Sequence, residues 1–215
     1  MTTPHPTHRP APRPAQQGLS LVVVLMILLV VSVIGIGAAR ISLSGERSSR
    51  FDRDYQLAFQ AAEAALMDAE FDIYGPNTAA AQRMATFSNS NASDFLPGCG
   101  TGTIQGLCQP TNPLRPVWFE VDFLATGNNA RSVEFGTFTG RNFDNALSGT
   151  GSAGARPSRS PRYIIEVLDD KGPGTGPRSR ADELVPKIYR VTAMGFGTRD
   201  EIQAVLQMTF QKEKP

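Results

Sequence analysis

The chain has 215 residues and a formal net charge of +1, from 21 Lys and Arg against 20 Asp and Glu. This balance leaves no basic surplus for a nucleic-acid-binding face, and we expect no nucleic-acid partner. The histidines are His5 and His8, ahead of the segments expected to fold. No Ser–His or Cys–His nucleophile can be built downstream of them, so we expect no enzyme, catalytic residue, metal site or cofactor.

An uncharged apolar segment covers Leu19–Ala39. A helix of this length rises roughly 30 Å, which matches the hydrocarbon core of a bilayer. The apolar part of a secretion signal is usually only about 7–15 residues long. Gly37 and Ala39, just before Arg40, leave signal-peptidase cleavage open as an alternative, but the length favours a retained span over 19–39.

The helical pattern continues through residues 40–74 and stops at Gly75-Pro76. Apolar residues recur there at spacings of three and four, which predicts a stripe on one helix face. The members of this stripe are Phe51, Tyr55, Ala58, Phe59, Ala62, Ala65, Leu66, Ala69 and Ile73. The other faces of the helix are expected to carry most of the polar residues, which are Arg53, Gln60, Glu63, Asp68 and Glu70. The pattern predicts one helix over 19–74, apolar all round in its first half and amphipathic in its second.

Cys99 and Cys108 are the only two cysteines, in the glycine-rich segment CGTGTIQGLC. Their spacing fits neither a zinc knuckle nor a redox CxxC motif. We favour a disulfide that closes this short loop, and two reduced thiols are the alternative. A disulfide would place the loop in an oxidising compartment outside the cytoplasm.

Strand patterns follow in the C-terminal half, whereas residues 86–116 read as loop. The last strand alternates apolar and polar residues, which predicts one face on a core and one in water. Covering its apolar face with the helical stripe gives an α+β fold, a long helix packed on a small antiparallel sheet. The expected strands are 117–124, 132–139, 162–168 and a hairpin of 187–197 with 201–211.

Four segments together resemble type IV pilins, and most closely minor pilins of the PilX type. They are QQGLSLVVVLMILLVV, GIGAAR, DYQLAFQAAEAALMDAE at 54–70, and YRVTAMGFGTRDEIQAVLQMTF near the C-terminus. The resemblance implies the type IV pilin fold. It also implies that prepilin peptidase cuts after Gly18 and that the new N-terminus, Leu19, is methylated. The apolar segment would then serve first in the inner membrane and later in the core of a filament.

The resemblance divides the chain into a leader (1–18), a membrane-spanning and filament-core helix (19–39), its amphipathic continuation (40–74) and a periplasmic pilin domain (75–215). Charge does not choose the orientation, because arginines flank the span on both sides. We place the N-terminus in the cytoplasm because a disulfide belongs outside it.

Val23 occupies the fifth position of the expected mature chain, where major pilins carry a glutamate. That carboxylate is thought to pair with the terminal amine of a neighbouring subunit, and an unpaired buried charge is costly. Val23 therefore favours a place at the pilus tip rather than along the shaft. The alternative is that Val23 is simply a lipid-compatible residue. Two further features depart from many pilins. The expected mature chain starts with Leu19 where many pilins have Phe, and Gln-Gln precedes Gly18 where a basic residue is common.

The expected function is that of a structural minor pilin that primes or caps type IV pilus assembly, supporting twitching motility and adhesion. The implied partners are other minor pilins, the major pilin, prepilin peptidase and the inner-membrane assembly platform, with a tip adhesin as a further candidate. Two alternatives stay open: a pseudopilin of a type II secretion system, and an unprocessed single-span envelope protein with a ligand-binding domain.

Overall fold

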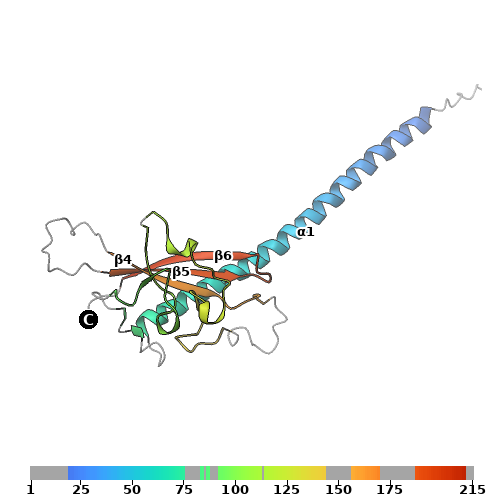
Figure 1. Ribbon diagram of the computed structural model, residues 1–215. Helices are drawn as coiled ribbons and strands as arrows, with labels where there is room; N and C mark the ends of the chain where they lie inside the picture. The colour runs from blue at the N-terminus through green and yellow to red at the C-terminus, as the bar shows by residue number, and fades with distance from the viewer. Residues whose placement is uncertain are drawn as a thin grey trace, which may run out of the picture. The chain divides into compact units, whose positions relative to one another are not determined.

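The computed structural model describes residues 19–75, 83–84, 86–87, 92–112, 114–143, 156–169 and 187–211. The chain divides into two compact units, Met1–Ser49 and Arg50–Pro215. The first unit consists, in its described part, of the beginning of one helix. The second contains the rest of that helix and every described strand (Figure 1).

Helix α1 spans Leu19–Tyr74, which confirms the helix predicted over 19–74. No proline interrupts these 56 residues, so the ladder of backbone hydrogen bonds can run through the whole segment. The helix ends at Gly75, which has a φ of 76°. Its N–H donates to the carbonyl oxygen of Phe71 at 2.8 Å, the left-handed cap that glycine adopts without steric penalty.

The sheet has the strand order β1-β2-β4-β5-β6, and β3 also pairs with β4. Strands β3, β4, β5 and β6 form the antiparallel part, as predicted, whereas β1 with β2 and β2 with β4 pair in parallel. The sheet is therefore mixed. A long connection separates β2 from β4, so the chain can return in the same direction. The bounds are β1 Leu96–Pro97, β2 Leu107–Gln109, β3 Val133–Glu134, β4 Arg162–Asp169, β5 Lys187–Phe196 and β6 Gln203–Gln211.

Strand β4 and the β5–β6 hairpin confirm the predictions for 162–168 and for the C-terminal hairpin. The strand predicted over 117–124 is wrong, because Val117–Phe119 form the 3₁₀ helix η2 and turns follow it. The strand predicted over 132–139 shrinks to β3, and residues after it form turns. Two further 3₁₀ helices are η1, Gly102–Ile104, and η3, Gly127–Asn129.

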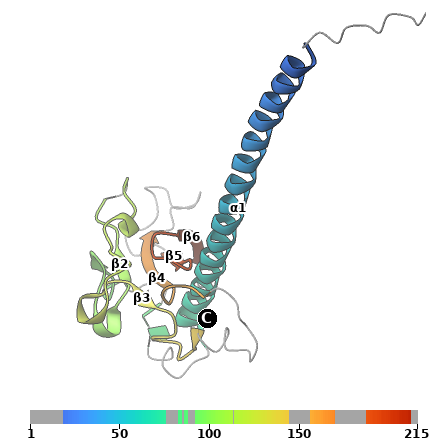
Figure 2. The same cartoon turned by 90° about the vertical axis from the view of Figure 1, so that its right-hand side faces the viewer.

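The second half of α1 packs its apolar stripe on one face of the sheet, with β4, β5 and β6 beside it in Figure 2. Alanines dominate this stripe and let the helix approach the strands closely. The approach is tightest at Gly195 in β5, where an added Cβ would overlap the backbone of Ala58 and Ala62. The main buried members on the two sides are Ala65, Leu66, Ala69, Ile73, Tyr163, Ile165, Tyr189, Val191 and Ala193.

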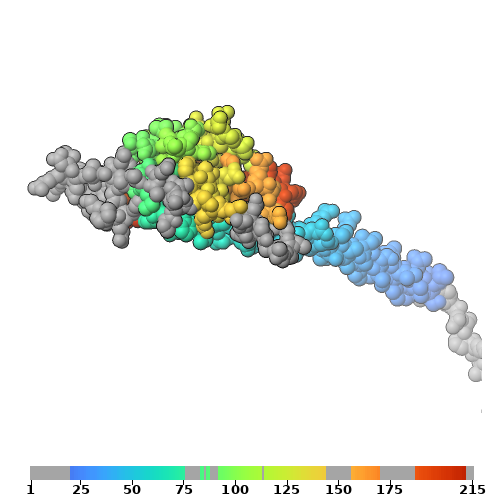
Figure 3. All heavy atoms as spheres, turned by 90° about the horizontal axis from the view of Figure 1, so that it is seen from below, coloured from blue at the N-terminus to red at the C-terminus, as the bar shows by residue number. Residues whose placement is uncertain are grey.

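A layer of loops covers part of the opposite face of the sheet. Its chain comes from described residues within 99–124, coloured green to yellow-green in Figure 3, whereas Gly136 and Thr139 lie beside α1. Ile164 of β4 points into this layer and packs with Val117, Phe123 and the two cysteines. The second unit is therefore built as three layers: helix, sheet and loops.

Gly195→Val should lower the free energy of unfolding by about 3 kcal/mol, because the larger side chain forces the helix off the sheet. Denaturant unfolding of the full chain in detergent micelles measures this. The control is Gly45→Ala, at a glycine of α1 with open space around it. It should change stability by at most about 1 kcal/mol, toward higher stability. Equal unfolding midpoints for wild type and Gly195→Val would contradict the close approach.

Candidate functional site

The first half of α1 exposes apolar side chains all around its circumference. Every described side chain from Ser20 to Arg50 is exposed, including Val23 at 49 %. A polar group inside this segment is satisfied internally, since Ser32 donates its hydroxyl to the carbonyl oxygen of Leu28 at 2.7 Å. Within the described residues one helix, α1, is both long enough and apolar enough to cross a membrane.

The residues of the expected processing site lie at the start of this helix. Leu19 is the first residue of α1, and Gly18 lies outside the described residues. Val23 follows about one helical turn after Leu19. In the described part of the chain no basic or acidic side chain lies within α1 before Arg40, so a buried terminal amine would find no carboxylate from this subunit's own span.

Cys99 and Cys108 form the predicted disulfide, with their Cα atoms 4.1 Å apart. Both cysteines are buried, and they help to form the core beneath the loop layer. Arg131 reinforces the loop by donating from Nη1 to the carbonyl oxygen of Cys99 at 2.5 Å. Closing a loop of this size stabilises the fold by about 2–3 kcal/mol in the chain-entropy model.

The buried carboxylate of Glu166 ties the loop layer to the sheet. One of its oxygens, Oε1, accepts the backbone N–H of Val117 at 3.0 Å. Both oxygens accept from the guanidinium of Arg190 on the neighbouring strand, at 2.8 and 2.9 Å. A bidentate Arg–carboxylate pair is among the stronger polar contacts in proteins. The N–H of Val117, the first residue of η2, is thus satisfied by a side chain rather than by a neighbouring strand.

Trp118 and Phe119 form an aromatic ledge at the margin of the loop layer. Their rings stack with centroids 4.0 Å apart, and Phe119 is 57 % exposed. Beside them a shallow groove of about 250 Å³ runs between the loop layer and Met194 of β5. Trp118 is only half-buried here.

Two aspartates of α1, Asp68 and Asp72, are fully buried. The prediction that Asp68 lies away from the packed face is wrong. Its Oδ2 accepts the backbone N–H of Gly136 at 2.8 Å, and its Oδ1 accepts the hydroxyl of Thr139 at 2.5 Å. The turn after β3 therefore supplies the polar partners that let a carboxylate sit in the interface. Burial raises the pKa of Asp68 above its usual range.

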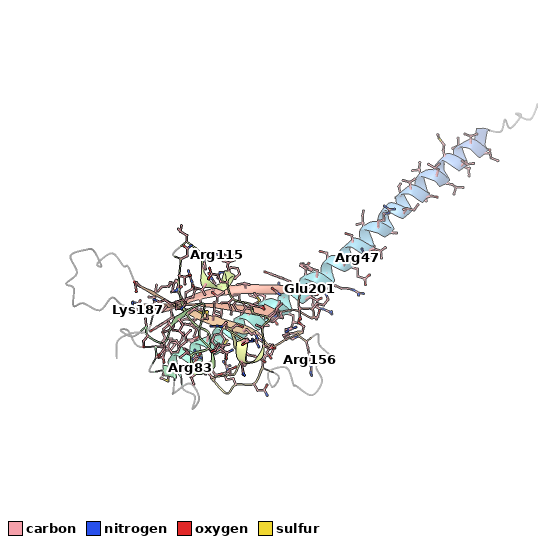
Figure 4. The ribbon with its side chains drawn as sticks, in the orientation of Figure 1. Arg47, Arg83, Arg115, Arg156, Lys187 and Glu201 are labelled. Carbon is pink, nitrogen blue, oxygen red and sulfur yellow. A yellow bond between two sulfur atoms is a disulfide. The ribbon has the colours of Figure 1, made fainter. Side chains whose placement is uncertain are left out.

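Asp72 links the helix to β4 and to Arg83. The hydroxyl of Tyr163 donates to Asp72 Oδ2 at 2.9 Å, and Arg83 Nη2 lies 3.3 Å from the same oxygen. Arg83 is labelled near the C-terminal end of α1 in Figure 4. Its guanidinium also stacks on the ring of Phe138, 3.6 Å from the centroid. Desolvation raises the pKa of the Asp72 carboxyl to about 6, and the Arg83 charge and the Tyr163 hydrogen bond offset this only in part.

The chemistry of these groups is structural. Within the described ranges, no group of three His, Cys, Asp or Glu side chains is placed to hold a metal ion. Buried polar groups here fasten one layer to the next: Asp68 and Asp72 fasten the helix, and Glu166 fastens the loop layer.

These features together define a pilin-like assembly subunit that a membrane can hold. They are the exposed apolar first half of α1, its buried second half on the sheet, and the loop closed by a disulfide. Comparison with protein families agrees. The family described as type IV pilus assembly protein PilX, C-terminal part, matches residues 99–212, and the PilX N-terminal family matches residues 17–66. The chain belongs to the PilX family of type IV pilus assembly proteins. No curated protein and no solved structure matches the chain in the same comparisons.

Sequence reasoning missed three residues of these networks, Asp72, Arg83 and Glu166. For Asp72 a signal existed, because it continues the row of Ala58 and Ala65, spaced by seven residues, on the apolar face. Glu166 interrupts an otherwise apolar strand, which also hints at a buried role. Arg83 carries no such signal, because it lies outside α1 and the ring on which it stacks, Phe138, comes from a distant part of the chain.

Asp72→Asn should remove most of the pH dependence of stability between about pH 4 and 6. The native carboxyl holds its proton up to a pKa of about 6, above the ordinary value of 3.8, so the native state binds more protons in this window. The free energy of unfolding of the wild type should therefore fall by about 2 kcal/mol as pH rises through it. Urea unfolding at a series of pH values measures this slope.

The matched control for the pH series is Asp52→Asn, which changes an exposed carboxylate of α1. This variant should keep the wild-type slope. A slope in Asp72→Asn as steep as in the wild type would show that another group is responsible.

Proposed function

We propose that this PilX-family chain is a minor pilin that primes or caps type IV pilus assembly at or near the tip. The observation that carries the proposal is the two-part character of α1. Its first half is exposed and apolar, and its second half is the packing helix of the folded unit. An all-round apolar helix can be solvated by lipid before assembly and by other apolar helices after it.

Processing follows from the same arrangement. Prepilin peptidase cuts after Gly18, Leu19 becomes the methylated N-terminus, and the span 19–39 is retained. The N-terminus lies in the cytoplasm and the domain 75–215 in the periplasm before assembly. The Cys99–Cys108 disulfide supports this topology, because disulfides persist outside the cytoplasm.

A place near the tip is supported by Val23. In a filament core, a terminal amine next to this subunit would find valine where a shaft subunit offers a carboxylate. A buried ammonium without a partner is strongly unfavourable. A subunit at the end of the filament escapes this cost, since it has no neighbour above it to neutralise.

In this role the chain is a structural subunit and not an enzyme. Its partners are other minor pilins, the major pilin, prepilin peptidase and the inner-membrane assembly platform, and a tip adhesin is a further candidate. Twitching motility and adhesion depend on this subunit because it affects the number of pili that the cell assembles. The PilX family match favours the pilus over a type II secretion system, and it gives a permanent envelope anchor no support.

Gly18→Val should leave the full-length precursor in the membrane, because a bulky residue replaces the glycine at the expected cut. Intact mass spectrometry should show wild-type protein beginning at methylated Leu19. The control is Gly37→Val, which changes a glycine of the span and should still be cut after Gly18. A mature chain starting at Arg40 would instead indicate signal-peptidase cleavage, and an uncut wild type would indicate a permanent anchor.

Val23→Glu should not raise pilus number, and it should lower it if the new carboxylate is buried without a partner. Val23→Leu keeps the position apolar and should match the wild type. Counting sheared pili and immunogold labelling of the subunit measure both effects. A gain in assembly with Val23→Glu, or labelling spread evenly along the shaft, would contradict a tip position and leave the subunit in the fibre.

A further inference from the structure

Strand β6 forms one margin of the sheet, with β5 between it and β4 (Figure 1). No described strand pairs with its outer side. The opposite margin is blunted, because β1 and β3 are only two residues long and β1 contains Pro97. β6 has nine residues and no such protection.

The hydrogen-bond pattern shows which backbone groups of β6 point outward. The N–H of Gly197 donates to the carbonyl oxygen of Ile202 at 2.7 Å, and this pair sets the alternation along the hairpin. Residues 204, 206, 208 and 210 then exchange hydrogen bonds with β5. Gln203, Val205, Gln207 and Thr209 turn their N–H and C=O groups away from it, and no described backbone group bonds to them.

The composition of β6 leaves this row of donors and acceptors accessible. Its sequence, QAVLQMTFQ, contains no charged residue and no proline. Gln207, Met208 and Thr209 are exposed. Sheet proteins usually protect a long edge with lysine, proline or a bulge, because an open edge accepts another strand. A free edge of this length is the surface that a peptide joins in strand addition.

The flank of α1 beside β6 is acidic. Two contacts mark this flank: Phe59 packs near Ala204, and Tyr74 donates its hydroxyl to the carbonyl oxygen of Gln211 at 2.9 Å. The helical spacing places Glu63 and Glu70 on the same side, between Phe59 and Tyr74. Both glutamates are exposed, and neither makes an ion pair with a described residue.

We propose that the outer edge of β6 is a docking site for an extended segment of a partner protein, which joins the sheet as an additional strand. Outward backbone groups of β6 supply its hydrogen bonds. The carboxylates of Glu63 and Glu70 select basic side chains on the side of the incoming strand that faces the helix. The ligand is therefore an extended basic segment with alternating apolar residues.

A second copy of this chain fits the edge poorly. Two β6 strands paired antiparallel about a twofold axis would carry their α1 helices on the same face of the joined sheet. The Glu63 and Glu70 side chains of the two copies would then face each other across the junction, and like charges so placed repel. The charge pattern therefore favours a different, basic partner.

Two synthetic peptides of equal length test the site: Lys-Val-Thr-Val-Lys-Val-Thr-Val-Lys and the same sequence with Glu in place of every Lys. Fluorescence anisotropy with the full chain in a neutral detergent measures binding. Hydrogen–deuterium exchange measures protection of β6. We expect the basic peptide to bind at concentrations below about 1 mM, to protect β6, and to bind at least about tenfold more tightly than the acidic peptide.

Thr209→Pro removes an outward N–H without removing a bond to β5, and proline is tolerated at such edge positions. It should weaken binding of the basic peptide about tenfold or more. Thr209→Ala is its control, because it keeps the N–H and should bind like the wild type. Glu63→Lys combined with Glu70→Lys should reverse the preference between the peptides, whereas Glu120→Lys, on the loop layer, should not.

Three results would overturn the proposal. The first is no binding of the basic peptide, or binding that leaves β6 unprotected. The second is equal binding by the wild type and by a Thr209→Pro variant whose thermal unfolding is unchanged. The third is a concentration-dependent dimer that Thr209→Pro disrupts, which would make a second copy the occupant. If Thr209→Pro unfolds, Thr209→Lys replaces it, since a charge on the edge should hinder pairing while all backbone groups remain.

Discussion

The second half of α1 packs directly on the backbone of the sheet. Alanines on the helix and Gly195 in β5 bring the two backbones together without a side chain between them. Interiors are packed as densely as crystals, so a contact of this kind holds the helix at one position along the strands. The buried second half of α1 is therefore fixed by its folded unit, while the first half remains a free apolar surface.

Polar groups complete this arrangement at its margins. Asp68 and Asp72 lie beside the alanine face and bond to the turn after β3 and to Tyr163. On the other side of the sheet, Glu166 and the disulfide hold the loop layer to β4. Buried carboxylates are unfavourable unless hydrogen bonds satisfy them, so each also determines which loop can sit beside it. The stacking of the layers and the hydrogen bonding of the buried carboxylates therefore depend on each other.

A PilX-family subunit built in this way separates two tasks between the halves of one helix. The exposed half needs only apolar character, which lipid and other apolar helices both accept. The second half of α1 needs small side chains at particular positions, because its surface must fit closely against the sheet. The sheet in turn keeps its covered side against α1 and leaves the β6 edge open, with no charged residue on it. Surfaces for assembly can therefore lie on the sheet without disturbing the contact that holds the helix.

Local pattern was enough to predict some elements. The long helix, the β5–β6 hairpin, β4 and the disulfide depend on periodicity, alternation and spacing within short segments, and all four are present. Asp68 was misplaced and 117–124 was wrongly expected to be a strand. In both segments a hydrogen-bond partner comes from far along the chain: Thr139 for Asp68 lies 71 residues away, and Glu166 for Val117 lies 49 residues away. Side-chain periodicity is enough to give the α+β class and the apolar span, because it acts within short segments. The parallel pairing of β2, the buried carboxylates and the open edge of β6 depend on which distant segments meet, so they emerge only from the folded chain.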